Sequence, residues 1–178
     1  MEAGLQAFYD ILKRRKSIRQ FSGKAIEEEK LARLWEVLRS SPSAANRQPW
    51  HFIVLPKKGR EKFDQEVLTK DGFHSAPIII VACAVPDEAW VRKEDGENYA
   101  WVDVSIAVTE FITAATAEGL GTCWVASFNL NQAKKLLKLP EEFEIVTLLA
   151  VGYPLTPLTV ETKQRKELSN ILSYHNMT

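Results

Sequence analysis

The sequence predicts an α+β domain, residues 1–178, in which helices cover a central sheet. A chain of 178 residues has the length of one domain and can bury a sizeable core. Hydrophobic residues make up 46% of the chain and charged residues 26%, the balance of a globular protein. Short apolar runs alternate with segments of helical periodicity along the whole chain, which gives the α+β order.

Two helices are expected in the first forty residues. The first runs into residues 13–16, and the second begins at Ile26, where three glutamates suit the positive end of the helix dipole. The segment 40–43, which includes a proline, ends the second helix. The apolar positions at helical spacing are Leu5, Phe8, Ile11 and Leu12 in the first helix and Leu31, Leu34, Trp35 and Leu38 in the second.

The middle of the chain predicts two strands separated by a short helix. The apolar run over 51–55 reads as a strand, and a short helix follows near 60–68. The run over 77–85 contains four consecutive β-branched residues and predicts a strand buried on both faces. The polar residues 86–98 form a loop.

The longest helix is expected over 99–118. Apolar side chains occupy most of its circumference, so it should be buried nearly all round. Asp103 and Glu110 interrupt the apolar run, which argues against a membrane span. A domain of this size rarely buries such a helix alone, so we expect part of it to lie between two subunits.

The last third predicts two more strands around a helix. Residues 122–127 form a strand, Asn131 caps a helix that closes at Pro140, and 144–153 form the last central strand. The tail beyond Pro154 has few apolar residues before its end. We therefore expect the tail to pack against another surface, for which a second subunit is one candidate.

Charge and cysteine content argue against several partners. Lys plus Arg equals Asp plus Glu at 23 each, so no overall field favours nucleic acid or an anionic membrane. Cys83 and Cys123 share no metal-binding spacing, and we expect two buried, reduced thiols. No secretory leader is visible over residues 1–4, so a cytoplasmic location is expected.

Two basic clusters are candidates for an anion site. Five cations lie within Lys13–Arg19 of this otherwise neutral chain, and Lys163, Arg165 and Lys166 lie near the other end. Such a run is often a solvated face, and cations also suit a helix C-terminus. Alternatively, arginine side chains and the Ser17 hydroxyl suit phosphate oxygens, and the two clusters could converge on one phosphate.

Two further segments have two interpretations each. The loop over 42–50 combines small residues, which permit close approach of a flat ligand, with amides that donate and accept; it could also be a plain loop entering a strand. The turn over 119–128 could present backbone N–H groups to a ligand, or could be a helix C-cap followed by a buried strand.

Several other chemistries lack a signature in the sequence. The histidines at 51, 74 and 175 show no metal spacing, and no GxSxG or phosphate-binding GxxxxGK[ST] motif is present. The lack of an acid–base or nucleophile signature is compatible with a flavin enzyme, whose cofactor performs the chemistry while the protein binds and tunes it.

Together these segments resemble the FMN-dependent nitroreductase family over nearly the whole chain. The segments that carry the resemblance are Arg15-Lys16-Ser17-Ile18-Arg19-Gln20-Phe21, Pro42-Ser43-Ala44-Ala45-Asn46-x-Gln48-Pro49-Trp50, Gly119-Leu120-Gly121-Thr122-Cys123-Trp124 and Arg165-Lys166. The resemblance implies a mostly antiparallel sheet flanked by helices. It also implies an intertwined homodimer with FMN sites at the subunit interface.

The resemblance assigns cofactor-binding residues but no catalytic side chain. One subunit would bind FMN through Arg15, Lys16, Ser17 and Arg19, with Arg15 at the phosphate and Arg19 at the N1–C2=O edge of the ring. The other subunit would cover the ring with Pro42, Ser43, Ala44 and Asn46. The backbone of Ala126 and Ser127 would face flavin N5, and Arg165 with Lys166 would return to the phosphate.

The implied activity is reduction of nitroaromatics, quinones or similar acceptors by NADH or NADPH in a ping-pong mechanism. Lys16 stands where Arg or His is commoner, and Ala126-Ser127 where some members carry Glu-Gly. The chain is also short for the family, so we expect an open pocket. The alternatives are reductive dehalogenation or flavin breakdown on the same fold, a non-enzymatic flavin- or anion-binding protein, and, least favoured by the charge balance, a nucleic-acid module.

Overall fold

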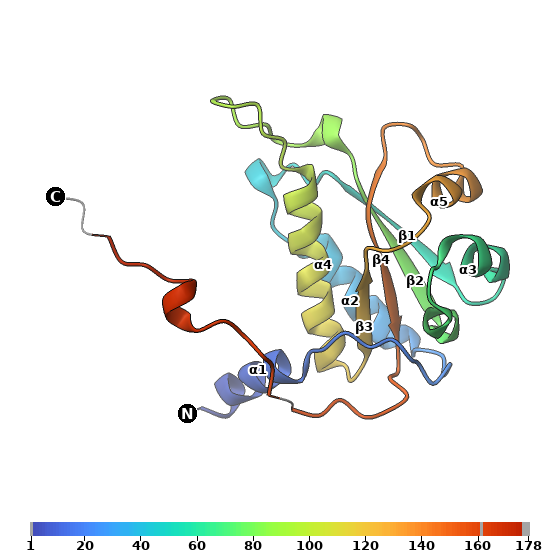
Figure 1. Ribbon diagram of the computed structural model, residues 1–178, viewed down its shortest axis with the longest axis horizontal. Helices are drawn as coiled ribbons and strands as arrows, with labels where there is room; N and C mark the ends of the chain where they lie inside the picture. The colour runs from blue at the N-terminus through green and yellow to red at the C-terminus, as the bar shows by residue number, and fades with distance from the viewer. Residues whose placement is uncertain (1, 161, 176–178) are drawn as a thin grey trace.

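The computed structural model describes residues 2–160 and 162–175 and confirms the α+β fold class. A four-stranded sheet, in the order β1-β2-β4-β3, is antiparallel throughout and has helices on both faces (Figure 1). The helices are α1 (Ala3–Arg14), α2 (Glu28–Ser40), α3 (Glu61–Val67), α4 (Ala100–Ala117) and α5 (Leu130–Leu137). The strands are β1 (Trp50–Pro56), β2 (Ile78–Ala84), β3 (Gly121–Val125) and β4 (Glu144–Gly152). Short 3-10 turns are η1 (Ala44–Asn46), η2 (Asp71–Ser75), η3 (Pro86–Glu88) and η4 (Leu168–Asn170).

The two central strands divide the interior into two apolar cores. Every residue of β2 is buried, as the uninterrupted apolar run predicts. Because successive side chains of a strand point to opposite faces, Ile80 joins the core under α2 and α4, while Ile79 joins the core under α3 and α5. Phe111 of α4 and Val67 of α3 are fully buried on these two sides.

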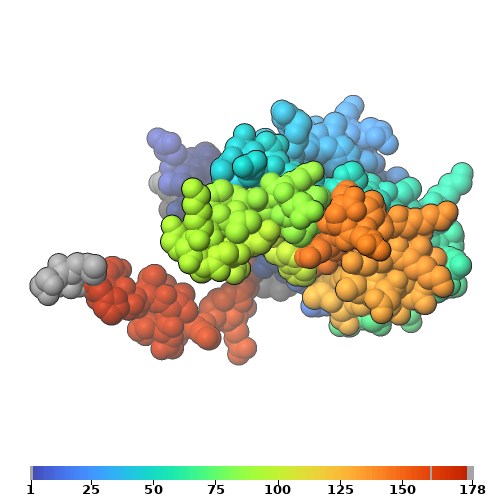
Figure 2. Space-filling view, turned by 90° about the horizontal axis from the view of Figure 1, so that it is seen from above, coloured from blue at the N-terminus to red at the C-terminus, as the bar shows by residue number. Residues whose placement is uncertain are grey.

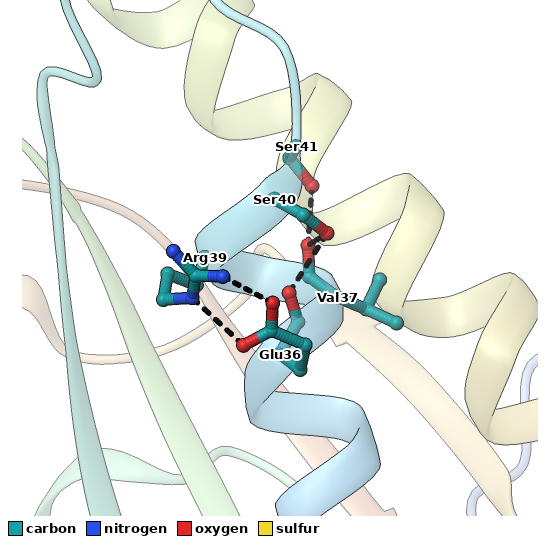
Figure 3. A network of polar contacts seen from close by, with 5 residues as sticks. All are labelled: Glu36, Val37, Arg39, Ser40 and Ser41. Carbon is teal, nitrogen blue, oxygen red and sulfur yellow. Dashed lines mark hydrogen bonds and ion pairs between the residues drawn. The ribbon is translucent and has the colours of Figure 1, made fainter.

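The end of α2 shows why the chain turns there. The Ser40 hydroxyl donates to the Glu36 carbonyl at 2.8 Å, and the Ser41 hydroxyl lies 2.9 Å from the Val37 carbonyl, which the end of the helix leaves open (Figure 3). Glu36 and Arg39 form an ion pair on the same turn. Pro42 cannot continue the helix, so residues 42–48 leave it as a loop.

Several element ends differ from the expected ones. Helix α1 stops at Arg14 rather than running to residue 16, because Arg15 is already extended with ψ at 120°. Helix α2 begins at Glu28 rather than Ile26. The prediction that Asn131 caps α5 is wrong: Asn129 is the cap, and its side chain accepts the Gln132 N–H at 3.1 Å.

Helix α4 is buried on one side only. Val104, Val108 and Phe111 face the core, whereas Trp101 and Val102 remain 49% and 43% exposed, so the expectation of burial all round does not hold within one protomer. The exposed face forms an apolar hollow of about 520 Å³. By length and composition α4 could cross a membrane, but it packs against α2 and the sheet as a core helix does.

The C-terminal tail leaves the body of the molecule. Residues 162–175 pass α1 in Figure 1, and both Figure 1 and Figure 2 show them projecting outward. Lys163 Nζ donates to the Leu12 carbonyl at 2.8 Å and so links the tail to α1. Leu168, Ile171 and Leu172 are between 54% and 67% exposed. The tail therefore presents an apolar end with nothing of its own protomer to cover it among the described residues.

Candidate functional site

The basic segment after α1 runs along the outer edge of β3. Ser17 forms a parallel bridge with Thr122, and the Ile18 N–H donates to the Thr122 carbonyl at 2.8 Å. Ile18 packs so closely on Gly121 that a Cβ there would lie 2.6 Å from Ile18 Cγ1. Gly121 thus permits this approach, and Gly119, with φ at 78°, follows the C-cap Glu118 at the end of α4.

A hollow of about 350 Å³, here called the Ser17 hollow, lies beside this segment. It is lined by Ser17, Arg19 and Gln20, by Lys70 and Gly72, and by Leu155 and Thr156 after β4. Its volume falls in the range of small-molecule sites. Two cations and a hydroxyl suit the anionic and carbonyl groups of a flavin nucleotide, so these residues fit FMN.

Lys70 is the functional candidate that sequence reasoning missed. A single lysine in a loop carries no pattern, and only the tertiary fold brings Lys70 beside Arg19. The approach depends on Gly72, because a Cβ at that position would lie 2.2 Å from the Arg19 carbonyl oxygen. Glycine immediately after Lys70-Asp71 was the only signal in the sequence.

The loop after β3 lies at the same end of the molecule. Thr69 Oγ1 donates to the Ser127 carbonyl at 2.8 Å, and Leu68 bridges Phe128. Ala126 and Ser127 follow β3 rather than forming its end, since the strand stops at Val125. The structure therefore brings Ser127 next to the segment that supplies Lys70.

Neither cysteine is suited to redox chemistry in the folded protein. Burial raises the pKa of the Cys83 thiol to about 11. Burial also raises the pKa of Cys123, although Arg19, Lys70 and Ser17 oppose the shift. We expect neither thiol to react with a disulfide reagent at about pH 8 until the protein unfolds, because the thiolate is the reactive form. Rapid labelling of the native protein would contradict this expectation.

The loop over 42–48 lies at the other end of α4. The Ala44 N–H donates to Asp103 Oδ1 at 3.0 Å, near the start of that helix. Helix α4 has 18 residues and spans about 27 Å. β3 begins just beyond its far end, so Pro42, Ser43, Ala44 and Asn46 lie far from the Ser17 hollow in the same protomer (Figure 1).

The remaining predicted ligands do not line the Ser17 hollow. Arg15 and Lys16 follow α1, and Arg165 and Lys166 lie on the tail, where Arg165 Nη1 donates to the Gln164 carbonyl. The predicted convergence of the two basic clusters on one phosphate is thus not seen in that hollow. Over residues 2–160 and 162–175, no group of three His, Cys, Asp or Glu side chains is placed to hold a metal ion.

Comparison with known proteins identifies the family. The model of the Nitroreductase family matches residues 12–70 and 64–153. The chain belongs to the nitroreductase family. A solved nitroreductase family protein of Clostridium difficile 630 has a TM-score of 0.84 and 30% identity, covering 94% of this chain and 98% of that one. The nitroreductase-like fold is thereby confirmed.

Two curated relatives of this nitroreductase family member differ in name. A protein of Archaeoglobus fulgidus with the provisional name NADH dehydrogenase/NAD(P)H nitroreductase is 29% identical over 165 residues, covering 86% of this chain and 87% of its own. Iodotyrosine deiodinase 1 of Rattus norvegicus is 27% identical over 196 residues, covering 94% and 69%.

Proposed function

We propose that this nitroreductase family member is an FMN-dependent oxidoreductase that uses NADH or NADPH to reduce nitroaromatics, quinones or similar electron-poor acceptors. The observation that carries the proposal is the hollow beside β3, where Ser17, Arg19 and Lys70 meet. The name of the Archaeoglobus fulgidus relative supports the choice of electron donor. We expect ping-pong turnover, in which donor and acceptor use one pocket in turn.

The residues of the hollow would bind and tune the cofactor. FMN, when bound, supplies the two-electron chemistry at its N5 atom. With FMN bound in the hollow, Arg19 and Lys70 would supply positive charge near a ring on which negative charge develops on reduction, and such charge would favour the reduced form. Ser17 adds a hydroxyl that can donate or accept. No side chain is required as an acid or base, since protons can come from solvent.

A second copy of the chain would complete the site. The Ser17 hollow and the loop over 42–46 lie at opposite ends of α4, so one protomer cannot place both on the same flavin. The exposed apolar face of α4 and the uncovered apolar end of the tail suit a large subunit interface. A homodimer would bring the loop of one protomer, and Arg165 with Lys166 of its tail, toward the hollow of the other.

Reductive dehalogenation is the second candidate, and similarity to iodotyrosine deiodinase 1 favours it. That alignment runs over 196 residues, more than the 178 of this chain, so the deiodinase carries residues that this chain lacks. This chain therefore has fewer residues than the deiodinase with which to cover a bound flavin. The general reductase is therefore the better-supported activity.

Purified protein tests the proposal. We expect a yellow protein after reconstitution with FMN, bleaching under anaerobic NADH or NADPH, and recovery of colour when a quinone or nitroaromatic is added. Release of iodide from iodotyrosine, with no turnover of quinones, would favour the second candidate. A protein that stays colourless with FMN, or that NADH and NADPH both fail to bleach, would overturn the flavin reductase.

Arg19→Ala is expected to lower the midpoint potential of bound FMN. Loss of a fixed cation destabilises the reduced flavin, and a tenfold change in a two-electron equilibrium corresponds to about 30 mV. We expect a fall of about that size or more by spectroelectrochemical titration, with slower reduction by NADH. Arg39→Ala, on the exposed face of α2, is the control and should leave the potential unchanged. An unaltered potential in Arg19→Ala would remove this role.

A further inference from the structure

Helix α4 contains two charged residues, Asp103 and Glu110, in a sequence that is otherwise uncharged and mostly apolar. They lie seven residues apart, about two turns, and so share one side of the helix. Asp103 is 1% exposed. Taking a carboxylate out of water costs several kcal/mol unless its partners compensate, so its position calls for a reason.

Both carboxylates bind the same neighbouring segment. Ser41 Oγ donates to Glu110 Oε2 at 2.6 Å, and the Ala44 N–H donates to Asp103 Oδ1 at 3.0 Å. The second oxygen, Asp103 Oδ2, is buried and has no hydrogen-bond partner among the described residues. A buried carboxylate with one oxygen unpartnered contributes little to the stability of the core. We therefore expect its role to lie in its hydrogen bond to the loop.

The loop that it holds is conformationally strained. Ala45, Asn46 and Gln48 have φ values of 50°, 55° and 53°, in the left-handed region that residues with a side chain rarely adopt. Each such residue costs roughly 1–2 kcal/mol, and the conformation persists only where its surroundings hold it. Inside the loop, the Gln48 N–H donates to Ser43 Oγ at 2.9 Å and Gln48 Nε2 to Asn46 Oδ1 at 3.1 Å.

These contacts fix which groups the loop can offer a ligand. The Ala44 N–H donates to Asp103. In the described part of the chain, the Ser43 hydroxyl accepts a hydrogen bond within the loop but donates to no partner, and the Asn46 side chain accepts one through Oδ1 while its Nδ2 amide donates to no partner. Both are donors suited to the carbonyl and nitrogen acceptors of a flavin ring.

We propose that Asp103 is a positioning residue, with Glu110 as a second anchor, that holds residues 41–48 in the strained conformation that presents Ser43 and Asn46 to FMN. This inference rests on the proposed function. Asp103 acts through the loop and does not itself touch the cofactor. Its carboxylate acts as an acceptor for the Ala44 N–H, so an amide in its place should keep most of the effect.

Two variants separate the acceptor from the bulk of the side chain. Asp103→Ala removes the acceptor, whereas Asp103→Asn keeps an oxygen that can accept from Ala44. Thr116→Val is the matched control, since Thr116 is a buried polar residue on the same helix whose hydroxyl donates to the Ile112 carbonyl. Size-exclusion chromatography and thermal unfolding establish that the variants share the fold and oligomeric state of the wild type.

The first readout needs no cofactor. Arg47 lies inside the loop, so limited trypsin cleavage after Arg47 reports how well the loop is held. We expect Asp103→Ala to be cut at least about tenfold faster than the wild type, a change in loop opening of about 1.4 kcal/mol. Asp103→Asn and Thr116→Val should stay within about threefold of the wild type.

The second readout is the dissociation constant of FMN from fluorescence quenching. We expect it to rise about tenfold in Asp103→Ala and to change little in Asp103→Asn and Thr116→Val. Equal cleavage of Asp103→Ala and wild type would overturn the proposal, and so would loss of loop protection in Asp103→Asn as large as in Asp103→Ala. If even the wild type fails to bind FMN, the proposed function falls, while the cleavage rates still decide whether Asp103 holds the loop.

Discussion

Ending the chain at Thr159 is expected to give a folded monomer that binds FMN about a hundredfold or more weakly than the full chain. The cores under α2 and α4 and under α3 and α5 lie within residues 18–158, so the truncated chain keeps them. It loses the apolar end of the tail together with Arg165 and Lys166. Sedimentation velocity gives the oligomeric state, and fluorescence titration gives the affinity for FMN.

A double substitution separates the two contributions of the tail. Arg165→Ala combined with Lys166→Ala removes the cations and leaves Leu168, Ile171 and Leu172 in place. We expect this variant to form the proposed dimer and to bind FMN more weakly, because only the proposed phosphate contacts would be lost. A truncated chain that is dimeric and binds FMN with wild-type affinity would show that the tail contributes neither to dimer formation nor to FMN binding.

Arg60→Met is expected to destabilise the protein by about 3–5 kcal/mol. Arg60 is 3% exposed and donates to Asp64 Oδ1 at 2.7 Å, to the Leu55 carbonyl at 3.1 Å and to the Ala76 carbonyl at 2.8 Å. The substitution leaves the buried Asp64 carboxylate unpaired and two carbonyls without this donor. Urea unfolding monitored by circular dichroism measures the loss of stability.

Two controls show whether the loss arises from the unpaired charge. Adding Asp64→Leu to Arg60→Met should recover much of the stability, since an apolar pair often replaces a buried ion pair at little cost. Lys62→Met breaks the exposed pair with Glu66, at 3.8 Å, and should cost no more than about 0.5 kcal/mol. A loss below about 1 kcal/mol in Arg60→Met would contradict the role of this buried pair.

The sequence predicts the elements of this fold better than their ends. β2 follows from an uninterrupted apolar run, because a central strand is buried on both faces. The cap of α5 was misplaced because two asparagines lie within three residues, and which one caps depends on where the chain leaves Phe128. The burial of α4 was overestimated because the sequence pattern shows which positions are apolar but not which of them pack against the rest of the protomer.

The candidate site was predictable only where residues cluster along the chain. Ser17 and Arg19 belong to a dense basic segment, and the structure places both in one hollow. Lys70 joins them across more than fifty positions, through a contact that depends on the bare backbone of Gly72. Asp103 holds the loop at Ala44 from 59 positions away, which no local pattern reveals.

The Ser17 hollow and the loop over 42–46 lie at opposite ends of α4, so in the proposed homodimer each protomer would contribute to two different pockets. In a mixed dimer of Arg19→Ala with Asn46→Ala, both lesions would fall in one pocket and the other would be wholly wild type. Co-refolding the two impaired variants in equal amounts should therefore raise turnover above that of either variant alone, because random pairing restores about a quarter of the wild-type sites. Genetic complementation between alleles of the same gene would be its counterpart in a cell.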